Sequence, residues 1–177
     1  MNKIFFLIFS LILCGCSQTN HLANKNETLN DERIVDQIIA RTANLIEKEK
    51  GLKPCGSGGQ MMNEVKMLAL AFVYNQPIDI DQGRELLVYT VETFVAMINE
   101  DERIHSYLYN YPFRPKNVEI RIFINNPDNS SIEAGKLCIV SAIDDYCAYK
   151  IRNTKTGRLE TIYKETFQEA KAKIKVN

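Results

Sequence analysis

The sequence is poor in the residues on which metal and nucleic-acid sites usually depend. It has only two histidines among 177 residues, and 22 basic residues are balanced by 22 acidic ones, so the formal net charge is zero. Nucleic-acid binding depends on a basic surface that neutralises phosphates, and a balanced chain gives no general reason to expect it. The C-x-x-C and H-E-x-x-H patterns of zinc sites are also missing. We therefore expect no metal, no cofactor and no nucleic-acid partner.

What remains is the composition of an ordinary globular protein. Apolar residues make up 45% of the chain and charged residues 25%, which are average values for a folded domain. The length favours one domain, because it leaves no room for two substantial cores.

The N-terminus has the pattern of an export signal. Lys3 provides the positive charge that usually begins such a signal, and an apolar run follows from Ile4 to Leu13. This run is too short to span a bilayer stably, which distinguishes it from a transmembrane helix. We therefore separate these residues from the folded part of the chain.

The end of this signal, LCGC at residues 13–16, resembles the lipobox of bacterial lipoproteins. In that family a small residue precedes the modified cysteine. Gly15 before Cys16 fits this rule, whereas Leu13 before Cys14 does not. The resemblance implies cleavage after residue 15, a diacylglycerol on the Cys16 thiol and usually a further acyl chain on its amine. Two or three chains would anchor the protein durably, where one would bind only marginally.

The resemblance also implies a location. Ser17 follows the cysteine, where an aspartate would be the usual signal for retention in the inner membrane. We therefore expect an anchor in the outer membrane, on either its periplasmic or its surface face. Residues 17–30 are polar and without period, which predicts a flexible tether. The expected organisation is a signal peptide at 1–15, a lipidated cysteine and tether at 16–30, and one domain at 31–177.

Helical patterns dominate the first half of this domain. Apolar residues at one-turn spacings predict an amphipathic helix over 31–50, which Gly51 would end. The run at 60–75 is apolar on nearly all sides and predicts a buried central helix. A third helix is expected over 78–101, with Asp79 and Asp81 as candidate N-caps and a short turn after it at 102–108.

Strand patterns dominate the second half. Apolar residues alternate from Val118 to Ile124, and the segments around Asp144-Asp145 predict a hairpin. A fourth strand is expected over 158–163 and a helix over 164–176. The expected fold class is α+β: about three N-terminal helices, then a three- or four-stranded antiparallel sheet, then a C-terminal helix.

Three cysteines remain after the signal and the lipid site: Cys55, Cys138 and Cys147. A two-residue turn at Asp144-Asp145 would place Cys138 and Cys147 several residues apart along the ladder, beyond the Cα distance that a disulfide accepts. We therefore expect no bridge between these two. Pairing of Cys55 with either of them stays open.

The glycine-rich segment GLKPCGSGGQ at residues 51–60 admits three interpretations. It could be a turn between two helices, which we favour. It could bind an anion through Ser57, Gly58 and Gly59, or it could hold a reactive Cys55 at a helix N-terminus, where the dipole lowers a thiol pKa. A thiol nucleophile also needs a base, for which His105 is the only histidine in the domain.

The most unusual composition lies at 105–115, HSYLYNYPFRP, where aromatic residues alternate and then meet a basic residue. Aromatic side chains with a polar end are common at protein interfaces, but they also cover seams between helices and sheets. The candidate interaction surface comprises Tyr107, Tyr109, Tyr111, Phe113 and Arg114. Our first hypothesis is a non-enzymatic, lipid-anchored envelope protein that binds a partner there, and the alternative is an envelope enzyme using Cys55 and His105.

Overall fold

The computed structural model describes the backbone of residues 19–174 and the side chains from residue 32 onwards. The expected signal peptide and the expected lipid acceptor Cys16 therefore lie outside the described residues. Among the described residues, no helix combines the length and the apolar character needed to cross a bilayer.

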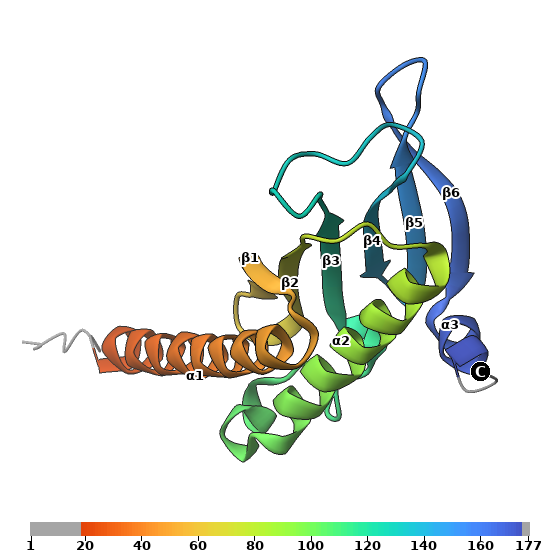
Figure 1. Cartoon of the computed structure of the whole chain (residues 1–177). Coiled ribbons are helices and arrows are strands. Elements are labelled where there is room, and N and C mark those ends of the chain that lie inside the picture. The colour runs from red at the N-terminus through yellow and green to blue at the C-terminus, as the bar shows by residue number, and fades with distance from the viewer. Residues whose placement is uncertain (1–18, 175–177) are drawn as a thin grey trace, which may run out of the picture.

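The domain has two layers, a six-stranded sheet and a set of helices packed against one of its faces (Figure 1). In chain order the elements are α1 (Thr19–Lys50), β1 (Lys53–Met61), β2 (Val65–Tyr74), α2 (Ile80–Glu100), η1 (Glu102–Tyr107), η2 (Pro115–Asn117), β3 (Val118–Ile124), β4 (Leu137–Ile143), β5 (Tyr146–Arg152), β6 (Leu159–Thr166) and α3 (Phe167–Ile174). The expected α+β class, with helical structure first and a helix last, is confirmed.

The sheet is larger than expected, and it is mixed. Its strands follow one another in chain order from β1 to β6. All neighbours are antiparallel except β2 and β3, which are parallel. The prediction of three or four antiparallel strands is therefore wrong. Parallel neighbours need a long crossover connection, and here α2 provides it.

The two additional strands come from the glycine-rich segment, expected as a turn, and from the segment in which a helix was expected. Residues 60–75 do not form a central helix: most of them belong to β2, which pairs with β1 in a hairpin. Leu68, Leu70 and Phe72 are buried on alternate positions, the period of a strand. The residues between them are half-buried on the other face of the sheet. A run that is apolar at nearly every position hides this period, so the pattern alone favoured a helix.

Helix α1 is longer at its start than the sequence predicted. It begins at Thr19, so residues 19–30 are helical where the polar composition predicted a flexible tether. No glycine or proline occurs between Ser17 and Lys50 to interrupt the helix. Its end is as predicted, because Gly51 has a φ of 69° and its N–H donates to Glu47 O at 2.8 Å.

The third predicted helix is α2, and it begins as expected. The Asp79 side chain accepts from the Gln82 N–H, and the Gln82 side chain accepts from the Asp79 N–H, forming a capping box. Four residues at helical spacing are fully buried between α2 and strands β3 and β4: Leu87, Val91, Phe94 and Ile98. The helix therefore packs along the centre of the sheet.

The β4–β5 hairpin follows the predicted register. Ile143 pairs with Tyr146, and Ala142 pairs with Cys147. Asp144 and Asp145 have φ angles of 49° and 66°, as expected of the two central residues of a type I′ turn. Strand β6 and helix α3 then follow close to their predicted positions.

Candidate functional site

The aromatic segment divides into a buried side and an exposed side. Phe113 is only 2% exposed and Tyr107 packs partly against the core, whereas Tyr109 and Tyr111 are 53% and 55% exposed. Arg114 is exposed as well. Of the five residues predicted for an interaction surface, the structure therefore presents Tyr109, Tyr111 and Arg114 to solvent and uses the other two largely for packing.

The exposed tyrosines are held by specific neighbours. The rings of His105 and Tyr111 lie 4.1 Å apart between centroids, tilted by 36°. The Lys66 ammonium lies 5.2 Å from the centre of the Tyr109 ring, within the range of a cation–π contact. We call His105, Tyr109, Tyr111 and Lys66 the aromatic surface.

The backbone beneath this surface is fixed to the domain at several points. The Tyr109 N–H donates to Val65 O at 2.9 Å. The Asn99 side chain, from the end of α2, accepts from the Phe113 N–H at 2.7 Å and donates to Phe113 O at 2.9 Å. Asn99 O also lies 2.8 Å from His105 Nε2. These contacts fix the backbone that carries the exposed rings.

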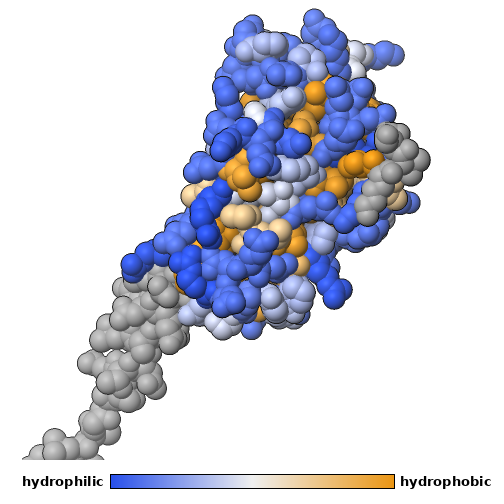
Figure 2. All heavy atoms as spheres, turned by 60° about the horizontal axis from the view of Figure 1, so that its bottom comes forward, coloured by the Kyte–Doolittle hydropathy of each residue, from blue (hydrophilic) through white to orange (hydrophobic). Residues whose placement is uncertain are grey.

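Figure 2 views the molecule from the underside of Figure 1. Hydrophobic residues appear on this face in separate patches between hydrophilic ones. The most exposed large apolar side chain among the described residues is Met62, at 91%. It lies in the turn between β1 and β2, shortly before Val65, to whose carbonyl Tyr109 is bonded. An exposed apolar side chain thus lies close in sequence to the strand residue that the aromatic segment bonds.

The glycine-rich segment matches none of the three interpretations drawn from the sequence, because it is a strand. Cys55, Ser57, Gly58 and Gly59 all belong to strand β1 at the edge of the sheet. No helix begins after them, because the chain turns directly into β2. The dipole and the N-terminal amides on which the thiol and anion interpretations depended are therefore not there, and the favoured interpretation as a turn between helices is also wrong.

The structure does not bring Cys55 and His105 together. In the β1–β2 register Cys55 lies beside Phe72 and Ala71, whereas Leu108, shortly after His105, bridges to Val65 at the opposite end of β2. A strand rises about 3.3 Å per residue, so these two ends are roughly 20 Å apart. Partial burial also raises the pKa of the Cys55 thiol, the opposite of what a thiolate nucleophile needs.

The three described cysteines are free, as the hairpin register led us to expect for Cys138 and Cys147. Both of these are buried. Burial raises the pKa of the Cys147 thiol to about 12, and the Cys138 thiol points to Lys150 O at 3.3 Å. Their pKa values and burial are typical of small apolar core residues rather than of reactive groups.

A buried ionic cluster, which the sequence did not reveal, is centred on the carboxylate of Glu165 in β6. One oxygen accepts from Arg84 Nε and from the Tyr149 hydroxyl, both at 2.7 Å. The other accepts from Lys173 Nζ at 2.5 Å. The cluster joins α2, β5, β6 and α3. We assign it a structural role, since these groups satisfy one another inside the domain.

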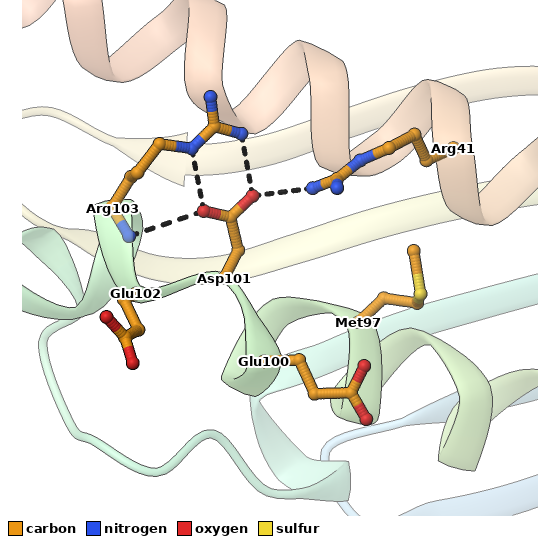
Figure 3. Close-up of a pocket in the computed structure, with 6 residues that line it drawn as sticks. All are labelled: Arg41, Met97, Glu100, Asp101, Glu102 and Arg103. Atoms are coloured by element: carbon orange, nitrogen blue, oxygen red, sulfur yellow. Dashed lines mark hydrogen bonds and ion pairs between the residues drawn. The ribbon is translucent and has the colours of Figure 1, made fainter.

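A second ionic group lies at the junction of α1, α2 and η1 (Figure 3). The Arg103 guanidinium donates two hydrogen bonds, of 2.9 and 2.8 Å, to the Asp101 carboxylate. Arg41 of α1 donates a third, of 2.5 Å, to the same carboxylate. The hydrogen bonds from Arg103 lower the pKa of Asp101, and the bond from Arg41 lowers it further. Burial acts in the opposite direction, but the pKa still lies well below its usual range. Glu100 and Glu102 point away from this carboxylate.

The hollow around Asp101 has a volume of about 370 Å³. Its two arginines are both engaged with the carboxylate, and two further acidic residues line its wall. This arrangement fastens α1 to the end of α2 and leaves little basic charge for an anionic ligand. The described part of the chain also contains no group of three or more His, Cys, Asp or Glu side chains that could hold a metal ion.

Sequence reasoning identified the tyrosines by their spacing. It could not identify Lys66 and Asn99, because they come from other elements and only the fold brings them to the aromatic segment. Comparison of this chain with protein-family models, curated proteins and solved structures finds no match.

Proposed function

We propose that this chain is a bacterial lipoprotein of the cell envelope whose folded domain binds a protein partner through the aromatic surface. One observation carries the binding proposal: Tyr109 and Tyr111 are more than half exposed although hydrogen bonds fix the backbone around them. Rigid tyrosines lose little conformational entropy on binding, and such side chains often dominate interface energies. No observation favours the thiol-enzyme alternative.

The anchoring part of the proposal depends on the LCGC pattern at residues 13–16. Replacing Cys16 with serine should prevent lipidation, so the variant should no longer incorporate labelled fatty acid in a bacterial host. The wild-type chain should incorporate it and should fractionate with the outer membrane. Cys14→Ser is the matched control, because it changes the neighbouring cysteine and should leave lipidation intact. Equal labelling of Cys16→Ser and wild type would contradict the proposal.

The binding part is tested with a Tyr109→Ala/Tyr111→Ala double variant. Chemical cross-linking followed by purification from envelope extracts should capture a defined protein with the wild type. The double variant should capture at least about tenfold less, because truncating central aromatic residues commonly costs that much in affinity. The unfolding temperature should change little, since both rings lie at the surface.

Tyr146→Ala provides the matched control for this experiment. Tyr146 is 46% exposed, and the Lys164 ammonium lies 4.0 Å from the centre of its ring, so it resembles Tyr109 but is located on β5. This control should retain the partner. If the double variant captures as much as the control, the aromatic surface is not the binding site.

A further inference from the structure

One edge of the sheet is open along nearly its whole length. Strand β1 pairs only with β2, and every residue from Lys53 to Gln60 is exposed. No charged residue occurs between Cys55 and Met61. Natural proteins usually protect such an edge with charged side chains, because its unpaired N–H and C=O groups can pair with another strand. This edge has no such protection over its central part.

The fold itself does not require most of the glycines in β1. A Cβ at Gly58 would meet nothing within 4 Å, and a Cβ at Gly56 would make only an ordinary contact of 3.7 Å with Ala71. Neither residue has a positive φ. Only Gly59 is constrained, because a Cβ there would come within 3.0 Å of Met67 O. Glycine weakens a strand, and where packing does not demand it, it often marks the close approach of another backbone.

The opposite edge of the sheet is different. Strand β6 carries Glu160 and Lys164 as exposed charges, and its register with β5 shifts beside Thr161. Exposed charges discourage pairing. Register shifts occur at both edges, so the charges are what distinguishes β6 from β1. If β6 of a second copy paired with β1, each copy would still have one unpaired edge. Further copies could then add without limit, so the assembly would not close.

We propose that β1 pairs with β1 of a second copy of this chain, antiparallel and about a two-fold axis at Gly58. The regular part of the strand, Gly56–Gln60, lies between two register shifts and has Gly58 at its centre. When this stretch pairs with the same stretch of a second copy, only uncharged residues meet. The assembly is then complete with two copies, because each β1 edge is used. The two sheets then form one continuous sheet.

Helix α1 adds to the contact area. It contacts β1 and runs past this edge on the helical side of the sheet (Figure 1). A copy paired along β1 therefore also lies beside α1, which matters because one short strand alone would bury less than a stable interface needs. Antiparallel pairing places the two β1–β2 turns at opposite ends of the dimer. Both aromatic surfaces stay open, so this inference does not depend on the proposed function.

Light scattering of the protein, purified in detergent and corrected for the micelle, tests the proposal. Wild type should have twice the polypeptide mass that denaturing mass spectrometry gives for one chain of the same preparation. Gly58→Lys and Gly58→Asp should each be monomeric, because the two-fold axis brings like charges face to face. The Cβ at this position meets nothing within 4 Å, so circular dichroism should remain that of wild type. Thr161→Lys on the β6 edge is the control and should stay dimeric.

Mixing the two charged variants gives the sharpest result. Gly58→Lys and Gly58→Asp should form a mixed dimer when combined in equal amounts, since position 58 of one copy then faces the opposite charge. A monomeric wild type at about 100 µM, well above a typical micromolar dissociation constant, would overturn the proposal. A Gly58→Lys variant that stays dimeric, or a mixture that stays monomeric, would overturn it as well.

Discussion

Glu165 is the ionisable side chain at the centre of the buried cluster that joins α2, β5, β6 and α3. Its side chain is only 2% exposed, and its carboxylate accepts hydrogen bonds from Arg84, Tyr149 and Lys173. Burial opposes ionisation of this carboxyl, but the bonds from Lys173, Tyr149 and Arg84 outweigh burial and lower its pKa. A buried charge is tolerated when its partners satisfy it in this way.

Replacing Glu165 with glutamine should therefore lower the free energy of unfolding by about 3 kcal/mol, because it leaves the buried Arg84 without its main counter-charge. Urea denaturation measures this change. Glu119→Gln is the matched control: Glu119 pairs with Arg121 at 3.1 Å near the surface, and its loss should change stability by less than about 1 kcal/mol. Equal effects of the two substitutions would contradict the structural role of Glu165.

The effect of Glu165→Gln on the free energy of unfolding should be smaller at acid pH. Because the pKa of Glu165 is lowered in the folded state, its contribution is complete above the unfolded pKa, about 4.3, and is lost as the pH falls through the folded value. The stability difference between wild type and Glu165→Gln should therefore be largest near neutral pH and should shrink in acid. A difference that does not depend on pH would show that packing, not charge, is responsible.

The aromatic segment illustrates how much of a site can be predicted from single residues. The alternation of aromatic residues from Tyr107 to Phe113 allowed either packing at the seam between helices and sheet or an interaction surface. It could not say which, because the choice depends on Asn99 from α2, which bonds both the N–H and the C=O of Phe113. These bonds hold Phe113 against the core, where it is buried.

Secondary-structure elements were predictable where their ends carry a local signal. The N-terminus of α2 is one such place, because Asp79 and Gln82 satisfy each other's backbone N–H groups. The Asp144-Asp145 turn and Gly51 at the end of α1 are others. In each case the signal lies within a few residues, so it does not depend on distant packing.

Replacing Asp79 with alanine should remove the cap and lower the free energy of unfolding by about 1 kcal/mol, since the Gln82 N–H loses its acceptor. Thermal or urea denaturation measures the loss. Asp79→Ser, which keeps a side-chain oxygen at the cap, should retain most of the stability. If alanine and serine are equally destabilising, the capping bond contributes little and the charge of Asp79 is the relevant property.

The arrangement of the complete sheet was the least predictable feature. The parallel contact of β2 with β3 joins residues far apart in the chain, such as Leu70 and Ile120, and α2 then packs against β3 and β4. Strand β2 also replaced a predicted helix, since Ala69 and Ala71 are good helix formers but lie here on the half-buried face of β2. Tertiary packing overrode the local preference.

Local chemistry therefore determined the helix caps, the hairpin turn, the alternation of strand β3, and the free state expected for Cys138 and Cys147. Each of these depends on neighbours a few residues away. Only the tertiary structure decided that the glycine-rich segment is an open sheet edge, that Cys55 and His105 are apart, and that Glu165 meets Arg84. These features arise from contacts between distant elements, because the pairing of β1, β2 and β3 and the packing of α2 depend on burying apolar faces that no single segment can bury alone.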